Sequence, residues 1–526
     1  MIHRRPIHLC TAAVLALSFS GCGPPSVPAP PGAAPVVLDG LFGEWEGFAP
    51  AVLDPADAPA PYADVRAVRV RHDEAGLYLD LSLEREVSLQ GLPGTLVLML
   101  DWTSPDEGWE AHGMRGVDAT LEFSPTFPQG GGLRGGIGVR MMDSAGGRAE
   151  LVTANVAGVI TAPTHASERF EMRIARGGVI PAELPMTARL VALNRDGRVV
   201  DETETFAIHP GAPRPRPTPP GSGAADPLAR APGTDVRVVS WNVGREDLFR
   251  QPDAFGIILR ALAPDLLVLD EVAGGHSAEE VEALLNRVVP DARPWRAVYG
   301  VSGGSQRGVI ATRGAAPLIV PPFDRIVPYP DSLLASVPAD APAQMRAGAE
   351  RRMADGVPTL GAVVQVGGRR MLAVTMDLES GGAPGGPQDR LRRMEATAIR
   401  AATENALREA GPLDGWLIAG DLNLVSARDP LRILVGTGMA GGELAVAFPL
   451  RLDGASATTW DNPVEPFTPG RLDYLLHPPS LAVAGGFVFS STDLAPRWRE
   501  RYGMTEETSR ATDHLPVVTD LRRVAR

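Results

Sequence analysis

The proline-rich segment over residues 209–234 constrains the fold of this chain more than any other feature. Proline favours extended polyproline II backbone and lacks the N–H that a helix interior or a central strand requires. The residues before this segment show a period of two, and the residues after it alternate between strand and helix patterns. A chain of 526 residues also exceeds one ordinary hydrophobic core. We therefore predict two domains, joined by a linker that lets them move semi-independently.

The pattern over residues 36–208 predicts an all-β domain. Leu77, Leu79, Leu81 and Leu83 alternate with polar or smaller residues, as in a half-buried strand. Other alternating or apolar runs follow, separated by Gly or Pro, and none has a helical period. A β-sandwich is the simplest architecture for this pattern.

Two segments in this half resemble the sugar-binding family 9-like β-sandwich modules. They are Leu-Asp-Gly-Leu-Phe-Gly-Glu-Trp over residues 38–45 and Asp-Glu-Ala-Gly-Leu-Tyr-Leu over residues 73–79. The resemblance implies a glycan as a partner of this domain. Such modules bind sugars with stacked aromatic rings, and Trp102 and Trp109 are the candidates here. Both rings also suit edge or core positions of the sandwich, which is the interpretation that we favour.

The first residues resemble a bacterial lipoprotein signal. A basic start at Arg4 and Arg5 precedes an apolar stretch over residues 7–19, and Ser-Gly-Cys follows at residues 20–22. The resemblance implies removal of residues 1–21, a lipid on Cys22 and a tether over residues 22–35. An ordinary secretory signal is the alternative. The other cysteine of the chain, Cys10, lies in the removed part, so we predict no disulfide partners. We expect an exported protein, lipid-anchored to a bacterial membrane and facing the periplasm or the cell surface.

The pattern over residues 235–526 predicts an α/β domain with helices covering its sheets. Strands are expected at residues 236–241, 266–269, 309–312, 371–375, 416–419 and 516–521, and helices at residues 254–263, 277–288 and 387–410. Ser277 and Glu280 have the spacing of a capping box at the start of the second helix.

Polar side chains follow three of these strands where each strand ends. Asn242, Glu271 and Asp421 occupy these positions. Loops beyond strand ends are common places for catalytic groups, because the sheet holds them rigidly. We expect these side chains to converge on one pocket that suits a divalent metal and a phosphate.

The motifs of this half, taken in order, resemble the endonuclease/exonuclease/phosphatase (DNase I-like) superfamily. They are Trp241-Asn242, Glu271-Val272, Gly420-Asp421-Leu422-Asn423, Thr459-Trp460, Arg471-Leu472-Asp473-Tyr474 and Asp513-His514-Leu515-Pro516. Each motif alone is ordinary turn or surface chemistry, but their common order makes the resemblance specific. It implies a four-layer α/β sandwich over residues 235–526 and hydrolysis of phosphoester bonds.

The metal site is expected at Glu271, with Asn242 and Asp513 beside it. Carboxylate and amide oxygens are hard ligands, which Mg²⁺ and Mn²⁺ prefer. The resemblance assigns the residue that matches Glu271 to the metal, which implies Mg²⁺ or Mn²⁺ as the cofactor.

The catalytic residues are expected to be Asp421, Asn423, Asp473 and His514. Asp421 resembles the residue that orients or deprotonates the attacking water, and Asn423 is suited to donating hydrogen bonds to the transition state. His514 would stabilise developing charge or protonate the leaving oxygen, with Asp473 holding its ring.

One position departs from the pattern of the superfamily. Many members carry a His in the mid-domain strand, and this chain has Met376 or Asp377 there, depending on register. We expect Asp377 to contact the substrate or to be an extra metal ligand. Arg307 is a candidate for the missing phosphate contact, and Trp460 a further substrate contact.

These features predict a metal-dependent phosphoesterase, most simply a phosphodiesterase that acts on nucleic acid or on a phospholipid head group. The formal net charge of −13 disfavours non-specific coating of nucleic acid, which depends on Lys and Arg. The alternative is a catalytically impaired lipoprotein that binds a glycan or a phosphate ligand.

Overall fold

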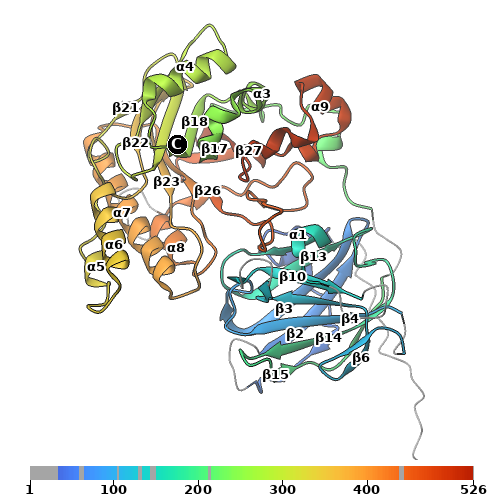
Figure 1. Ribbon diagram of the computed structural model, residues 1–526. Helices are drawn as coiled ribbons and strands as arrows, with labels where there is room; N and C mark the ends of the chain where they lie inside the picture. Colours follow the sequence, from blue (N-terminus) through green and yellow to red (C-terminus); the bar gives the residue numbers. More distant parts are fainter. Residues whose placement is uncertain are drawn as a thin grey trace, which may run out of the picture.

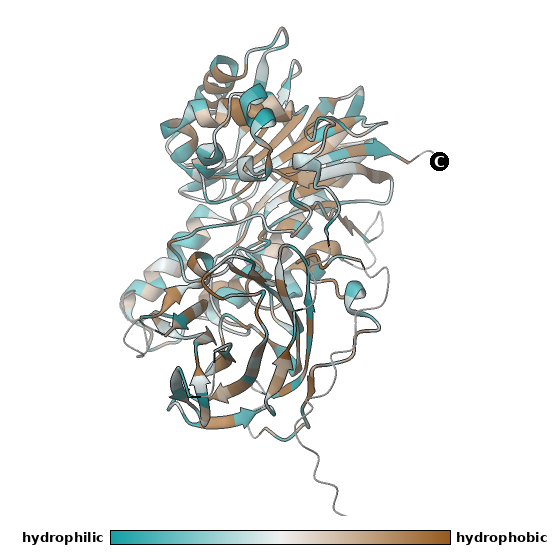
Figure 2. Ribbon diagram, turned by 90° about the vertical axis from the view of Figure 1, so that its right-hand side faces the viewer, coloured by the Kyte–Doolittle hydropathy of each residue, from teal (hydrophilic) through white to brown (hydrophobic). Residues whose placement is uncertain are grey.

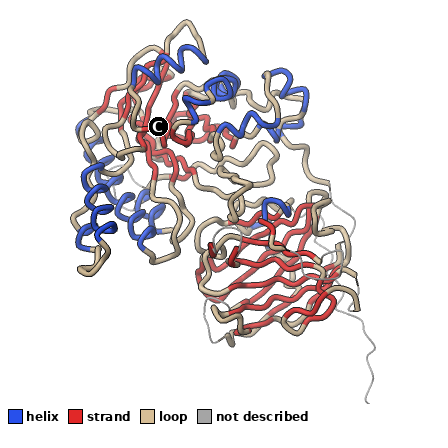
Figure 3. The backbone as a smooth tube through the Cα atoms, viewed as in Figure 1, coloured by secondary structure: helices blue, strands red, loops and turns tan. Residues whose placement is uncertain are grey.

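The structure is a computed structural model that describes residues 34–58, 64–103, 106–127, 133–142, 150–210, 215–436 and 443–524. The described residues form two parts, each with its own sheets (Figure 1). The first part consists almost entirely of strands, and nearly all helices belong to the second part (Figure 3). The predicted signal with Cys10 and Cys22 lies outside the described residues.

The N-terminal part contains two antiparallel sheets with an apolar core between them. One sheet has the order β1 (Val52–Leu53), β2 (Val65–His72), β3 (Gly76–Val87), β13 (Ser167–Ala175), β12 (Val159–Ala162). The other has the order β11 (Val152–Thr153), β10 (Ile137–Met141), β7 (Ala119–Phe123), β4 (Thr95–Asp101), β14 (Met186–Leu193), β15 (Val199–Glu202), with β16 (Phe206–Ile208) also on β14. Two short hairpins, β5 (Trp109–Ala111) with β6 (Met114–Val117) and β8 (Thr126–Phe127) with β9 (Leu133–Arg134), extend from these sheets. The alternating leucines of β3 are buried in this core, as their period of two predicts.

The C-terminal part contains two six-stranded mixed sheets. The first has the order β19 (Trp295–Tyr299), β20 (Gln306–Arg313), β18 (Leu266–Ala273), β17 (Val236–Arg245), β28 (Val517–Arg523), β27 (Leu481–Val488). The second has the order β21 (Leu318–Ile319), β22 (Gly361–Val366), β23 (Arg369–Asp377), β24 (Gly415–Asp421), β26 (Asp473–His477), β25 (Ala445–Val446). Side chains from β17 and β18 share one apolar core with side chains from β22, β23 and β24, so the two sheets pack face to face.

Helices cover the outer faces of the two sheets and complete a four-layer α/β sandwich. Next to the first sheet lie α2 (Asp247–Arg250), α3 (Pro252–Leu262), α4 (Ala278–Val288) and α9 (Pro496–Tyr502), and next to the second lie α5 (Ser332–Ala335), α6 (Ala343–Asp355), α7 (Pro387–Glu409) and α8 (Asp429–Val435). The apolar strands lie between helices that carry hydrophilic residues on their outer sides (Figure 2). The capping box at α4 forms as predicted, because Ser277 Oγ accepts from Glu280 N at 3.3 Å and Glu280 Oε2 accepts from Ser277 N at 2.9 Å.

The two parts of the chain contact each other through backbone hydrogen bonds. These bonds are Leu38 N to Ala455 O (2.9 Å), Ala457 N to Leu38 O (3.1 Å), Ile137 N to Pro466 O (2.9 Å) and Ala166 N to Ser426 O (2.7 Å). The linker is held as well: Arg216 pairs with Asp73 at 2.7 Å, and Gly221 N donates to Leu452 O at 3.1 Å. These contacts argue against the semi-independent movement that the proline-rich sequence predicts.

The end of β24 depends on a glycine. Gly420 has a φ of +138° and lies beside Met376 on β23, where a Cβ atom would be 2.1 Å from Met376 O. Only glycine permits both this backbone conformation and this close approach. The residue that follows is Asp421, so the position of its carboxylate depends on the absence of a side chain at Gly420.

We predict that Gly420→Ala lowers the free energy of unfolding by at least about 2 kcal/mol, since it adds both backbone strain and overpacking. The matched control is Gly348→Ala in α6, where a Cβ meets no atom within 4 Å and which should stabilise by roughly 0.5–1 kcal/mol. Urea denaturation of both variants checks this. Equal stabilities of the two variants would contradict the role of Gly420.

Candidate active site

Three carboxylates occupy matching positions on adjacent strands of the second sheet. Asp377 on β23 is opposite Asp421 on β24, and Asp421 is opposite Asp473 on β26. All three side chains are buried. Each strand extends beyond the range that its apolar residues predict, so these polar residues are the last or first residues of their strands.

The first sheet adds Asn242, Asp270 and Glu271 to the same place. Asn242 on β17 is opposite Asp270 on β18, and the pairing of both neighbours of β18 shifts register just after Asp270. Glu271 lies in this shift with a φ of +51°, a left-handed conformation that is rare for a residue other than Gly or Asn. Backbone strain of this kind clusters at functional sites.

A histidine lies between two of these carboxylates. Asp473 Oδ2 is 2.9 Å from His514 Nδ1, and Asp421 Oδ2 is 3.7 Å from His514 Nε2. The indole N–H of Trp241 donates to His514 O at 3.0 Å and fixes the backbone there. The short contact with Asp473 sets the orientation of the ring, so that Nε2 faces Asp421.

Two carboxamides hold Asp421. Asn423 Nδ2 donates to Asp421 Oδ2 at 2.9 Å and to Leu378 O at 2.8 Å, and Asn423 N donates to Asp421 Oδ1 at 2.8 Å. Asn242 Nδ2 donates to Asp421 Oδ2 at 3.3 Å. Both Nδ2 hydrogens of Asn423 are therefore used inside the protein. The structure gives Asn423 a positioning role rather than the donor role toward the transition state that the sequence suggests.

Burial dominates the electrostatics of this cluster. Burial raises the pKa of Asp421 to about 8, against the opposing charge of His514. Burial also raises the pKa of Asp270 and of Asp377 well above the usual range, and neighbouring carboxylates add to both shifts. Burial alone would lower the pKa of His514, but Asp473 and Asp421 outweigh it and raise this pKa to about 10. The raised carboxyl pKa values thus reflect burial and crowding of acidic groups, which His514 opposes at Asp421 and which His514 and Arg245 oppose at Glu271.

Several oxygens of the cluster have no hydrogen-bond partner within the described part of the chain. They are both carboxylate oxygens of Asp270 and Oδ2 of Asp377. Glu271 Oε1 accepts a hydrogen bond from Gln306 Nε2 at 2.6 Å, and the Asn242 side chain interacts with the same carboxylate. Buried acceptors without partners are costly, and a divalent cation removes that cost. The donor set of carboxylates and a carboxamide fits Mg²⁺ or Mn²⁺.

Asp513 is held at the edge of the cluster by a loop from the second sheet. Trp460 Nε1 donates to Asp513 Oδ2 at 3.0 Å, and Asn462 Nδ2 donates to the same oxygen at 3.3 Å. The backbone of Asp461 also donates to Asp513 O at 2.9 Å. The indole N–H of Trp460, which the sequence assigns to a substrate, is thus used to hold Asp513.

Residues 239–514, just over half of the chain, match the Endonuclease/Exonuclease/phosphatase family. The chain belongs to this family. Its members hydrolyse phosphoester bonds and typically use divalent metals. A search of curated proteins finds no match to this chain.

The chain is also similar to solved structures of low sequence identity. A humanized D. rerio TDP2 is 18% identical, with a TM-score of 0.33, over 55% of this chain and 98% of that one. The 3′ phosphatase NExo from Neisseria, bound to a product DNA hairpin, is 15% identical, with a TM-score of 0.34, over 54% and 98%. A Bacteroides vulgatus member of the family is 12% identical, with a TM-score of 0.35, over 55% and 99%.

The structure resolves the register at the position where this member departs from the family pattern. Met376 is fully buried in the apolar core, and Asp377 lies beside Asp421. Asp377 is therefore the residue that joins the cluster. Arg307 lies on β20 opposite Val272, and no contact brings it to the carboxylates.

Sequence reasoning missed residues that act through their neighbours. Asp270 directly precedes Glu271, the expected metal ligand. In the sequence it is indistinguishable from an ordinary strand residue, because only the structure shows that its buried carboxylate oxygens have no hydrogen-bond partner among the described residues. Gln306 and Asn462 hold Glu271 and Asp513 across the fold, and local sequence carries no signal for such contacts. Arg245 follows Asn242 closely and lies near enough to Glu271 to lower its pKa, against the dominant effect of burial.

The two tryptophans proposed for sugar binding are half-buried. Trp102 packs against the main core of the sandwich, and Trp109 packs against a smaller apolar cluster. These positions favour the packing role for both rings. Glycan binding by this part stays a prediction.

A separate group of carboxylates lies in the sandwich. Asp54, Asp64 and Asp201 offer ligand oxygens within 4.8 Å of one another, the one such trio of metal-ligating residues in the described ranges. Burial and the charge of Asp201 raise the pKa of Asp54 from 3.8 to about 6. This trio is remote in sequence from the family motifs and does not belong to the phosphoesterase site.

We predict that Asp54→Asn raises the melting temperature at pH 7.5, with chelator present, by roughly 2–4 °C, the shift that about 1 kcal/mol produces in a domain of this size. Asp54 holds its proton more tightly when folded, so its contribution to stability is lost as the pH rises from about 4 to about 6. Asp54→Asn has no ionisable group at this position, so it does not lose this stability as the pH rises. The side chain of Asp54 is partly exposed, and solvent screening therefore keeps the stability difference small.

Melting curves between pH 4 and pH 7.5 check this, with the exposed Asp196→Asn as the matched control. The gain from Asp54→Asn should shrink toward pH 4. A gain that is independent of pH, or no gain, would contradict the repulsion argument.

Proposed function

We propose that the C-terminal part is a divalent-metal-dependent phosphodiesterase held at the bacterial cell envelope. The observation that carries this proposal is the placement of His514 between Asp473 and Asp421. The other sheet contributes Glu271 and Asn242 to the same cluster, and Asn242 donates to Asp421. Convergence of both sheets on one buried cluster is costly for stability and therefore calls for a functional reason.

The metal would be held by Glu271, Asp513 and Asn242, with Asp270 and Asp377 nearby. Mg²⁺ or Mn²⁺ supplies Lewis-acid polarisation of a phosphate oxygen when bound. The unpartnered oxygens of Asp270 and Asp377 support this assignment, because they have no other partner among the described residues.

Asp421 and His514 carry the proton transfers in this proposal. Asp421 accepts a proton from water as the water oxygen bonds to phosphorus. The ester P–O bond then breaks, and protonated His514 stabilises the charge or supplies a proton to the leaving alkoxide. Asn423 and Asn242 position Asp421, and Asp473 positions His514. Arg245 lies close enough to Glu271 to lower its pKa and is suited to the remaining phosphate charge.

Glu271→Gln and His514→Ala should each lower kcat toward bis(p-nitrophenyl) phosphate by about 10²–10⁴-fold in the presence of Mn²⁺ or Mg²⁺. Glu271→Gln removes a charge that the metal needs, and His514→Ala removes the acid. Glu279→Gln and His209→Ala, both exposed, are the matched controls and should behave as wild type. Steady-state rates with metal and with chelator check this, and equal rates for all five proteins would reject an enzyme.

The envelope location rests on the lipoprotein signal, whose residues lie outside the described part of the chain. Within the described part, no helix is long and apolar enough to span a membrane. The proposed attachment is therefore a lipid on Cys22, followed by the tether over residues 22–35.

We predict that the mature protein fractionates with membranes and incorporates labelled palmitate, and that Cys22→Ser abolishes both because the thiol is the site of attachment. Cys10→Ser, in the part that would be removed, is the matched control and should leave labelling intact. Membrane fractionation with mass analysis of the N-terminal peptide checks this. An unlabelled wild-type protein in the soluble fraction would overturn the anchored location.

A further inference from the structure

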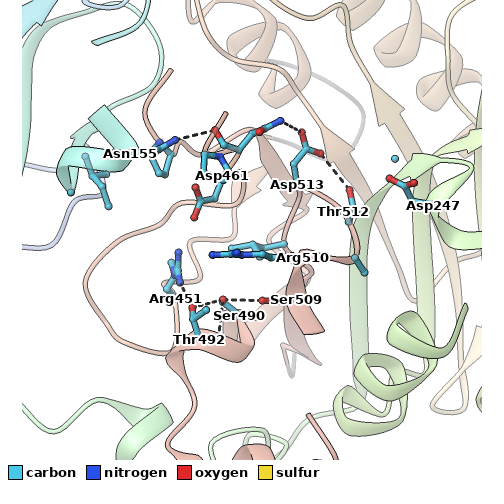
Figure 4. A pocket seen from close by; sticks show the side chains of 18 of the residues that line it. Asn155, Asp247, Arg451, Asp461, Ser490, Thr492, Ser509, Arg510, Thr512 and Asp513 are labelled. Carbon is cyan, nitrogen blue, oxygen red and sulfur yellow. Dashed lines mark hydrogen bonds between the residues drawn. The ribbon is translucent and has the colours of Figure 1, made fainter. Parts of the chain in front are cut away.

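A cavity of about 720 Å³ lies between the sandwich and the C-terminal part. The sandwich contributes Asn155 from α1 (Ala154–Ala157) and residues 158–160 to its wall. The C-terminal part forms the rest with loops, the start of α2 and two short 3-10 helices, η4 (Ser491–Asp493) and η5 (Glu506–Ala511) (Figure 4). Asn155 Nδ2 donates to Asn462 O at 3.0 Å and to Phe467 O at 3.4 Å, so the two halves meet at its rim. Its volume is within the range of sites that enclose a small molecule.

The cavity adjoins the proposed metal site. Thr512 and Asp513 line the cavity, and His514 follows them in the chain. Figure 4 shows Asp513 between Asp461 and Thr512. A phosphate at the metal edge would therefore place one of its ester groups in this cavity.

The wall of the cavity combines polar groups with apolar side chains such as Val159, Ile160 and Leu515, and it lacks aromatic rings. None of the lining residues, all of them within the described ranges, is Phe, Trp, Tyr or His. Hydroxyl groups come from Ser490, Thr492, Ser509 and Thr512. Carboxamides come from Asn155, Gln251 and Asn462. Nucleobases bind single-strand sites chiefly by stacking on aromatic rings, and quaternary ammonium groups bind in aromatic cages. This wall offers neither.

The charges of the wall nearly balance. Asp247, Asp461 and Asp513 face Arg451 and Arg510, which leaves a formal charge of −1. Arg451 is already paired with Asp493 at 2.6 Å, and Arg510 is paired with Glu507 at 2.8 Å. The cavity therefore lacks the free cationic groups that a nucleic-acid backbone requires.

Two carboxylates of the wall are free to accept hydrogen bonds. Within the described part, the structure gives the side chains of Asp247 and Asp461 no hydrogen bond and no ion pair. Asp247 lies beside Gly244 and Thr512, and Asp461 is exposed next to Asp513. A carboxylate accepts two hydrogen bonds at once, which matches a pair of neighbouring hydroxyl groups.

We propose that this cavity binds a neutral polyhydroxylated group, a sugar or polyol, that is esterified to the phosphate at the metal site. The assignment rests on the proposed function and adds the substrate class to it. In this arrangement the sandwich forms one wall of the substrate site through Asn155, and Asp247 and Asp461 hold the hydroxyl groups. The sandwich is thus a specificity element of the hydrolase.

Four phosphodiesters test the assignment on the full chain with Mn²⁺: glycerophosphoinositol, glycerophosphocholine, the dinucleotide dTpdT and bis(p-nitrophenyl) phosphate. We expect kcat/KM to be highest for glycerophosphoinositol among the first three. Asp461→Ala should lower it about 10- to 100-fold for that substrate, mainly through KM, the loss that removing a hydrogen bond to a charged group causes. The loss should be several-fold smaller for bis(p-nitrophenyl) phosphate, since that substrate has no hydroxyl groups for Asp461 to bind.

Asp324→Ala, exposed and not part of the wall, is the matched control and should be neutral for all substrates. Calorimetry of myo-inositol 1-phosphate on metal-free protein adds a readout besides turnover, and Asp461→Ala should weaken this binding by the same factor. Absence of all turnover with intact binding would reject the proposed function and keep the cavity assignment. Turnover of bis(p-nitrophenyl) phosphate with a preference for dTpdT or glycerophosphocholine, or with no effect of Asp461→Ala, would overturn the cavity assignment alone.

Discussion

Burial of like charges is the constraint on which the rest of this structure depends. Asp377, Asp421 and Asp473 lie on three neighbouring strands, and like charges at paired positions of a sheet destabilise it. The two sheets bear this cost because their large shared apolar core extends up to the residues that flank the carboxylates and stabilises the strands around them. His514 offsets part of the charge, and a divalent cation would offset more. The candidate site thus lowers the stability of the strand ends, while the apolar core stabilises the rest of the two sheets. Such local costs are expected where residues are retained for function.

The loop between β25 and β26 connects the sandwich with the active site. Thr459 Oγ1 accepts from Asp473 N at 3.0 Å, and Trp460 holds Asp513. Further along, Thr468 Oγ1 is 3.0 Å from Thr161 Oγ1, and Thr468 N donates to Gln90 Oε1 at 2.8 Å. One loop therefore positions two carboxylates of the site on one side and binds the sandwich on the other. The N-terminal part therefore contacts the same loop that holds Asp473 and Asp513.

Many of the strands and helices could be predicted from the sequence, because their apolar residues repeat with the period of a strand or a helix within a few positions. The capping box at Ser277 and the strand before Asp421 are examples. The order of short motifs indicated the family because several weak patterns coincided. Three features had no local signal: the left-handed backbone at Glu271, the partnerless state of Asp270 and the docking of the sandwich. Each depends on contacts between segments that are distant in sequence, such as the hydrogen bond from Ile137 N to Pro466 O. Such contacts produce no recognisable pattern in the neighbouring residues of either segment.

Asp377 adds another carboxylate beside Asp421, where the resemblance to the superfamily implies a histidine at this strand end. Under the proposed function, this carboxylate changes how the site would bind a phosphate. A phosphate that entered the site without a metal would meet repulsion from the carboxylates and attraction from His514 and Arg245. A bound divalent cation reverses this balance, since it is the largest local charge. In the proposed function, binding of the metal and binding of the phosphate would therefore be coupled, and by linkage each would strengthen the other. Recognition of the phosphate would then depend on the metal rather than on a cationic side chain at residue 377.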